Sequence, residues 1–134
     1  MSESVVFEPV VQKSTNDCAV ACLAMYLGLP YAQVREAAGR RLTKEGMTTR
    51  AIINTAKKLG VELVLQKDFD ADDVGIADLL REDDSDGHVV LFVRGAVWTT
   101  ASGQIWADLF TYCKVHKFKL LGLITRSPLE GGNR

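Results

Sequence analysis

Three polar residues of this 134-residue chain, Cys18, His88 and Gln12, have the side chains that chemistry on an amide bond requires. A cysteine thiolate is a nucleophile, an imidazole can take and return a proton, and a carboxamide can donate to an oxyanion. Cys18 stands where a polar stretch gives way to an apolar one, which predicts the first turn of a helix. A helix N-terminus lowers the pKa of a thiol, so we expect an activated Cys18, unlike Cys22 and Cys113, to react with iodoacetamide well below pH 8.

The positions of the other polar groups fit the same chemistry. His88 directly follows Gly87 at the start of an apolar run, which predicts a histidine at the end of a strand, facing a cleft. The second histidine, His116, lies in a basic segment that we expect to be exposed. Gln12 and the backbone N–H of Cys18 could together bind an oxyanion. By residue type alone the set is only suggestive, because a buried thiol, a strand-end histidine and a polar glutamine occur together by chance in many domains.

The hydrophobic pattern places helices before strands, which predicts an α+β fold rather than a regular alternation of the two. Residues 5–11 read as an extended entry segment, and residues 88–98 as two strands joined by a tight turn at Arg94-Gly95. Further strands are expected at 61–66 and 118–126. Helices are expected at 18–28, 31–41, 48–60, near 76–80 and at 105–117. The helix at 18–28 is apolar almost throughout and should be buried on all sides.

Composition excludes several classes of function. With 47% apolar and 25% charged residues and a net charge of -1, the chain shows no strong electrostatic preference for nucleic acid, and we expect no nucleic-acid partner. No apolar run approaches the ~20 residues of a membrane span and no signal peptide precedes residue 12, so we expect a cytoplasmic protein. The three cysteines predict neither a disulfide framework nor a metal site, and no cofactor is expected. We expect one domain, residues 1–134, with a flexible tail from about residue 127.

The segment "QKSTNDCAVACLAMYLGLPY" resembles the active-site segment of the bacteriocin-processing, double-glycine cysteine peptidases, which are papain-like. That family's pattern has a Gln, five intervening residues, Asp-Cys-Gly, a short gap and Cys-Leu-Ala-Met. The matching residues are Gln12, Asp17, Cys18, Cys22, Leu23, Ala24 and Met25, while Ala19 replaces the usual glycine. Looser similarity continues through "GMTTRAIINTAKKLG" to "GHVVLFVRGAVW", so the resemblance covers residues 11–98.

The resemblance implies a papain-like fold, with N-terminal helices packed on a C-terminal antiparallel sheet. It implies a thiol protease that hydrolyses a peptide bond of a peptide or protein substrate, after Gly-Gly in this family. Cys18 would be the nucleophile, His88 the base, and Gln12 with the Cys18 amide the oxyanion donors. Cys22 would be its buried neighbour, and Asp17 is expected to cap the helix rather than act as an acid.

The chain departs from the family pattern at the group that orients the histidine. An Asp or Asn usually follows the second strand of the histidine hairpin, but this sequence has Thr99 there. A threonine can accept a hydrogen bond but lacks the charge that stabilises imidazolium, so Gln104 and Asp108 are alternative candidates for the orienting group. Three alternatives therefore stay open: an active peptidase, a catalytically inactive domain that binds a peptide or partner protein, and an interaction or toxin-type module. The sequence does not decide whether the chain self-associates.

Overall fold

The computed structural model describes residues 17–43, 46–84, 87–100 and 104–127. The helical half comes first and consists of α1 (Cys18–Leu27), α2 (Tyr31–Ala38), the 3₁₀ turn η1 (Gly39–Arg41) and α3 (Thr49–Lys58). The strands that follow are β1 (Leu63–Gln66), β2 (Val74–Arg81), β3 (Gly87–Val93), β4 (Ala96–Trp98) and β5 (Ile105–Trp106). The described chain ends with α4 (Leu109–His116) and β6 (Phe118–Arg126).

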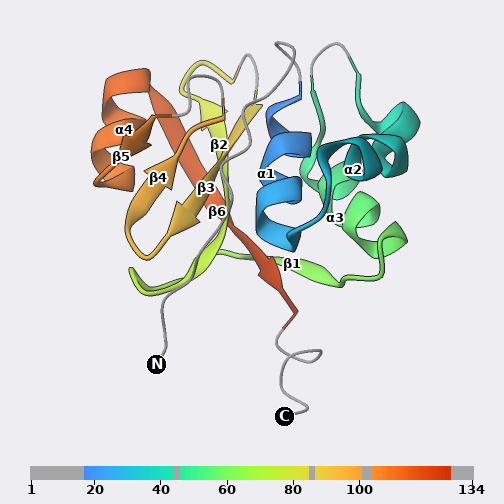
Figure 1. Cartoon of the computed structure of the whole chain (residues 1–134). Helices are drawn as coiled ribbons and strands as arrows, with labels where there is room; N and C mark the ends of the chain where they lie inside the picture. Colours follow the sequence, from blue (N-terminus) through green and yellow to red (C-terminus); the bar gives the residue numbers. More distant parts are fainter. Residues whose placement is uncertain (1–16, 44–45, 85–86, 101–103, 128–134) are drawn as a thin grey trace.

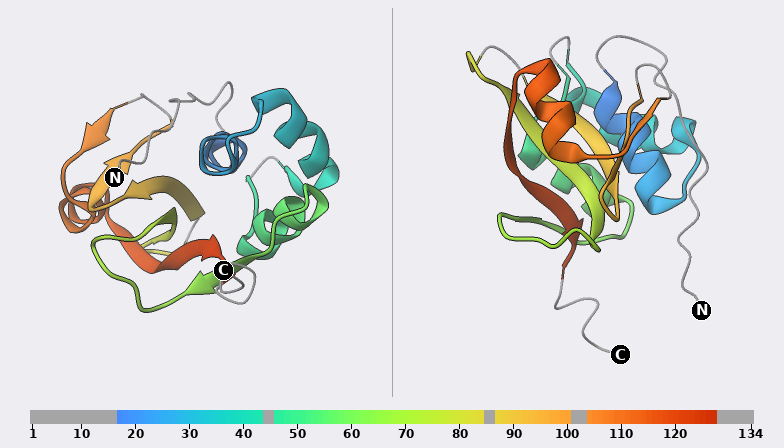
Figure 2. Two further views of the ribbon diagram at one scale, coloured as in Figure 1. Left: turned by 60° about the horizontal axis from the view of Figure 1, so that its bottom comes forward. Right: turned by 90° about the vertical axis from the view of Figure 1, so that its left-hand side faces the viewer.

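Within the described ranges the strands form one antiparallel sheet in the order β1-β6-β2-β3-β4-β5. The helices α1, α2 and α3 lie on one side of this sheet and α4 lies on the other, as Figure 1 and the first view of Figure 2 show. This is the expected α+β arrangement, in which N-terminal helices pack on a later antiparallel sheet. The C-terminal strand β6 is inserted between β1 and β2, near the centre of the sheet.

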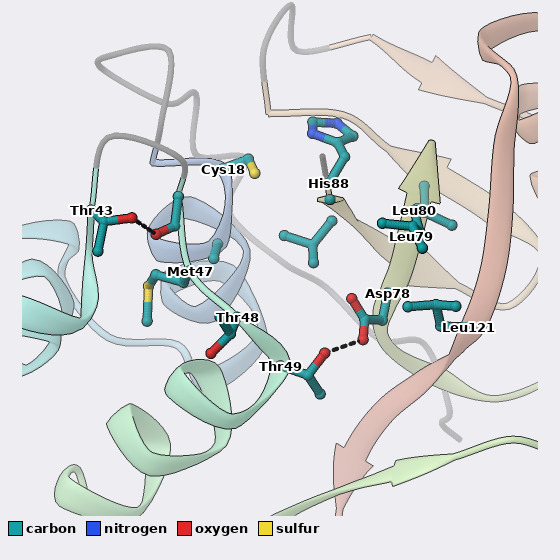
Figure 3. Close-up of a pocket in the computed structure, with 14 residues that line it drawn as sticks. Cys18, Thr43, Met47, Thr48, Thr49, Asp78, Leu79, Leu80, His88 and Leu121 are labelled. Carbon is teal, nitrogen blue, oxygen red and sulfur yellow. Dashed lines mark hydrogen bonds between the residues drawn. The ribbon is translucent and has the colours of Figure 1, made fainter. Parts of the chain in front are cut away.

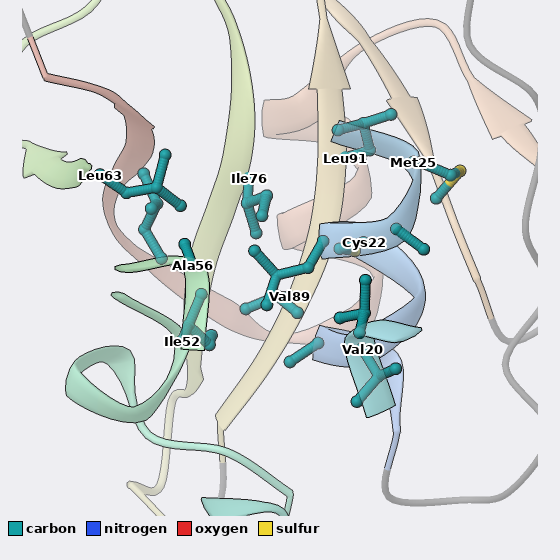
Figure 4. Close-up of a cluster of buried hydrophobic side chains, with 14 of the residues drawn as sticks. Val20, Cys22, Met25, Ile52, Ala56, Leu63, Ile76, Val89 and Leu91 are labelled. Carbon is teal, nitrogen blue, oxygen red and sulfur yellow. The ribbon is translucent and has the colours of Figure 1, made fainter. Parts of the chain in front are cut away.

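Helix α1 is the centre of the larger hydrophobic core. Its residues Ala19–Met25 are all buried, because α2 and α3 cover the sides that the sheet does not. Figure 4 shows Val20 and Cys22 of α1 against Val89 and Leu91 of β3. The expectation of a helix buried on all sides is thus confirmed. Gly28, in the left-handed conformation with φ 69°, ends the helix.

The hairpin of β3 and β4 also forms as expected. Arg94 and Gly95 both have positive φ, 49° and 96°, which is the geometry of a two-residue turn whose twist matches the strands. Residues of β3 then alternate between the two faces of the sheet: Val89 and Leu91 pack toward α1, while Val90 and Phe92 pack toward α4. This alternation determines which way every group on the strand points.

The helix expected near residues 76–80 is wrong, because that segment is part of the central strand β2. β2 pairs with β3 on one side and with β6 on the other, and its residues 75–79 are buried. An apolar run that is buried on both faces has no alternation to reveal a strand. The helix expected at 105–117 is shorter, since β5 occupies residues 105–106 and α4 begins only at Leu109.

Two further expectations concern the two ends of the chain. The entry segment 5–11 lies outside the described residues, and so do residues 128–134 of the expected tail. Ser127, where that tail was expected to begin, is buried, and its N–H donates to the carbonyl of Glu62 at 2.9 Å. None of the helices in the described ranges has the length and apolar character needed to cross a membrane.

Candidate active site

Cys18 is the first residue of α1, as its position in the sequence predicts. The N–H groups of a first helical turn have no acceptor within the helix and point toward whatever lies beyond the N-terminus. The residues that follow Cys18 are buried from Ala19 to Met25, so the core holds this helix end in place. The Cys18 side chain itself is only partly buried, whereas Cys22, one turn further along, is fully buried.

The ionisation of Cys18 differs from the expectation based on the helix N-terminus. Burial raises the pKa of the Cys18 thiol above its ordinary value, and the nearby Asp17 carboxylate raises it further. The backbone N–H groups of Val89, Ala19 and Cys18 lower the pKa, but the net shift is upward. The thiol form is therefore favoured before substrate binds, and the expected reactivity below about pH 8 does not follow from this environment.

Asp17 occupies the N-cap position, but its side chain makes no capping hydrogen bond. The carboxylate is fully buried and accepts a short hydrogen bond from the Tyr31 hydroxyl of α2. Burial and this bond to a carboxylate raise the pKa of Tyr31 to about 12. The expected side-chain cap is thus wrong, because Tyr31 lies close enough to be the partner of Asp17. The bond instead ties the start of α1 to α2.

His88 lies near the start of β3, where its ring is stacked on another aromatic ring. The ring centroids of His88 and Phe118 are 5.4 Å apart and the planes differ by 12°. Phe118 is buried at the start of β6 and carries the Arg81 guanidinium over its ring at 4.8 Å. Because Phe118 covers one face of the imidazole, it limits the orientations that His88 can adopt.

Cys18 and His88 line the same cavity, which has a volume of about 340 Å³. Figure 3 shows the Cys18 sulfur and the His88 imidazole among the residues that line it, one carried by α1 and the other by β3. The other walls come from Thr43 and residues 46–49 before and within α3, from β2 and from Leu121 of β6. The structure thus brings together a thiol and an imidazole that lie seventy residues apart in the sequence.

The other expected site residues are placed as follows. Gln12 lies outside the described residues. Thr99 is buried directly after β4, and both its N–H and its hydroxyl donate to the carbonyl oxygen of Gln104, at 2.9 and 3.0 Å. Asp108 is exposed, accepts from the N–H and hydroxyl of Thr111 as the cap of α4, and lines a different cavity. The structure therefore does not bring Asp108 to the cavity of Cys18.

Two residues of this region were missed by sequence reasoning. Asp78 lines the cavity, but the helix wrongly expected at 76–80 concealed that it projects from a central strand. Phe118, behind His88, was read only as part of the last strand. A lone aspartate inside an apolar run was the signal for Asp78, because a buried carboxylate at such a position needs a partner or a function.

Comparison with known proteins agrees with this fold. A model of the Peptidase C39 family matches residues 7–79, which is more than half of the chain and includes Cys18 and Asp78. Among solved structures, the peptidase domain of Streptococcus ComA, described as a bi-functional ABC transporter involved in a quorum-sensing pathway, is similar in fold. The TM-score is 0.50 at 22% identity, over 91% of this chain and 86% of that one.

No curated protein sequence matches the chain significantly. The match to ComA, at 22% identity, supports the papain-like α+β fold alone. The family match rests on the N-terminal part of the chain, where the first helix begins at the cysteine that the sequence singled out. The resemblance read from the sequence is confirmed at this level: the chain belongs to the Peptidase C39 family.

Proposed function

We propose that the protein is a cysteine peptidase that hydrolyses a peptide bond with Cys18 as nucleophile and His88 as general base and acid. The observation that carries the proposal is that Cys18, at the N-terminus of α1, and His88, at the start of β3, line one cavity of about 340 Å³. Membership of a peptidase family supports the same reaction class.

The reaction proceeds in two halves. Cys18 Sγ attacks the substrate carbonyl carbon as its proton passes to His88, and the electron pair of the C=O bond moves to oxygen. The oxyanion accepts a hydrogen bond from the Cys18 N–H, and Gln12 is the proposed second donor. The C–N bond then breaks, and the amine leaves with the proton from His88. Water, deprotonated by His88, hydrolyses the Cys18 thioester to release the acid and regenerate the thiol.

The raised pKa of Cys18 bears on the first step. Because burial favours the thiol, the proton leaves for His88 during the attack rather than before substrate binds. His88 must therefore be held in position, and stacking on Phe118 supplies that restraint. We propose Thr99 as the second orienting group. Its hydroxyl hydrogen is donated to Gln104, so its oxygen would act toward an imidazole only as an acceptor.

We further propose that the substrate is a peptide or protein with small residues, such as Gly-Gly, before the scissile bond. The Cys18 side chain is partly buried at the cavity wall. A substrate without side chains at these positions can bring its backbone closest to such a sulfur. The Gly-Gly cleavage typical of the double-glycine peptidases that the sequence resembles has the same steric requirement.

Cleavage of a fluorogenic Gly-Gly peptide by the full chain tests the proposal. We expect Cys18→Ala and His88→Gln each to lower kcat/KM by about 10³-fold or more. The matched controls, Cys113→Ala and His116→Gln, remove a buried cysteine that does not line the cavity and the other histidine, and should stay within about threefold of wild type. Thermal melts establish that all four variants fold. Cleavage by folded Cys18→Ala at the wild-type rate would contradict the assignment.

Binding without cleavage is the second candidate function. It is favoured by the neutral Thr99 at the position of the usual acid and by the raised pKa of Cys18. In that case the wild-type chain yields no product, yet binds the Gly-Gly peptide saturably, and Cys18→Ala binds it with the same affinity. Product formation that depends on Cys18 excludes this function.

A further inference from the structure

A carboxylate, Asp78, lies in the wall of the same cavity and has no role in the proposed reaction. It projects from the middle of β2, in the centre of the sheet, and is only 6% exposed. Burial of a charged group at such a position is costly unless the group is paired. A structural residue there would be expected to be apolar, as its neighbours Ala77 and Leu79 are.

Within the described residues, the hydrogen-bonding capacity of the Asp78 carboxylate is only partly used. One oxygen accepts a short hydrogen bond from the hydroxyl of Thr49, in the first turn of α3. The positive end of that helix further favours a negative charge nearby. Among the residues that the structure describes, Thr49 is the sole hydrogen-bond donor to Asp78, and no Lys or Arg pairs with it. The second oxygen points into the cavity in Figure 3.

Asp78 is not placed to orient His88. In the ladder between β2 and β3, Asp78 is opposite Val89, and His88 is opposite Leu79. Side chains of consecutive residues point to opposite faces, so Asp78 and Val89 face α1 and α3, whereas His88 stacks on Phe118 on the other face. Asp78 therefore reaches the cavity from a different direction and would meet a different part of a substrate.

The wall of the cavity that Asp78 lines is more apolar than polar. Met47, Leu80, Val89 and Leu121 contribute to the cavity wall. At Asp78 the pairing of β2 with β6 shifts register, from Gly122 to Leu120, so that Leu121 lies at a bulge. An apolar wall with one carboxylate fits a lysine or arginine side chain, whose aliphatic stem packs on apolar groups while its cationic head reaches an acid.

We propose that Asp78 forms a specificity subsite for a basic side chain of the substrate, bound beside the reacting bond. This inference rests on the proposed function, from which it takes the class of substrate, a peptide. The cavity, at about 340 Å³, is in the range of ligand sites and large enough to hold a side chain together with adjacent backbone. Thr49 positions the carboxylate, and the basic group supplies the counter-charge that the described residues do not.

The test uses the full chain and peptides in which Gly-Gly is kept before the scissile bond, with lysine, norleucine or glutamate placed in turn at each position before the two glycines or after the scissile bond. Norleucine has a similar aliphatic chain without the charge. We expect one position at which wild type prefers lysine to norleucine by about tenfold or more in kcat/KM, with glutamate the poorest. In Asp78→Asn that lysine-to-norleucine ratio should fall to about one. The control Asp72→Asn removes an exposed carboxylate outside the cavity and should keep the wild-type ratio.

The experiment distinguishes a wrong subsite proposal from a wrong peptidase proposal. If no peptide is cleaved, the peptidase proposal fails, and the same peptides are titrated against wild type and Asp78→Asn by fluorescence polarisation. Tighter binding of the lysine peptide that disappears in Asp78→Asn still supports the subsite. Equal handling of lysine and norleucine by wild type at every position overturns it, whether or not Asp78→Asn folds. So does an unchanged lysine preference in folded Asp78→Asn.

Discussion

The ionisation of Cys18 leads to a quantitative prediction about its reactivity. Burial raises its pKa, the Asp17 carboxylate adds to the rise, and the N–H groups of Val89 and Ala19 only partly offset it. An ordinary cysteine, with a pKa of about 8.5, is roughly 3% thiolate at pH 7. Because the net shift is upward, the Cys18 thiolate should be a smaller fraction than this before substrate binds, and should fall about tenfold for each further unit of pKa.

The perturbation is a change of pH, and the assay is alkylation by iodoacetamide with each cysteine followed separately by peptide mass mapping. Cys18 should label slowly at pH 7, accelerate about tenfold per pH unit and reach half its maximal rate above about pH 8.5. Glutathione provides the reference thiol. Cys113, whose pKa burial raises to about 11, should need a still higher pH, and the fully buried Cys22 should label last.

A half-maximal labelling rate below about pH 8 for Cys18 would refute this reasoning. It would show that the helix N-terminus and a protonated His88 together stabilise the thiolate more than burial destabilises it. His88→Gln separates these two contributions, because it removes the imidazolium and keeps the helix. If the half-maximal pH in wild type is low and His88→Gln raises it, Cys18 and His88 form an ion pair before substrate binds.

Two further predictions concern the scaffold that positions the site. Tyr31→Phe removes a hydrogen bond to the fully buried Asp17 carboxylate, so the free energy of unfolding in urea should fall by about 1.5–3 kcal/mol; a loss below about 0.5 kcal/mol would contradict this role. Gly75→Ala places a Cβ 2.6 Å from the carbonyl oxygen of Ile124 in β6, which should lower the melting temperature and cost about 1–3 kcal/mol. The control Gly87→Ala, whose Cβ would be 3.4 Å from its nearest neighbour, should melt near wild type, and equal effects of the two substitutions would be inconsistent with the clash.

Local patterns predicted the elements that carry the proposed catalytic pair. The change from polar to apolar residues at Cys18 predicts where α1 begins, and Gly28 predicts where it ends. Arg94-Gly95 predicts the hairpin turn that follows the strand of His88. A helix start, a helix end and a tight turn each depend on the backbone conformation and solvent exposure of a few consecutive residues. The residue types in that short stretch therefore predict them.

The same local reading failed where a segment takes its structure from distant partners. Residues 74–81 form a strand because β3 and β6 pair with both of its edges, and β6 comes from the far end of the chain. The side chain of Asp17 bonds Tyr31 rather than capping α1, because the packing of α2 brings a hydroxyl to it. Neither partner is visible in the immediate sequence around these residues.

The sequence by itself determined the chemistry that is available: a thiol at a helix start, an imidazole at a strand start, and a family pattern around the first of them. Only the tertiary structure decided how these groups are arranged and charged. It placed Cys18, His88 and Asp78 around one cavity, stacked His88 on Phe118 and raised the pKa of Cys18 by burial. The burial of a side chain and the shape of a cavity depend on contacts between segments that are far apart in the chain. They are therefore set only when the helices and the sheet pack together.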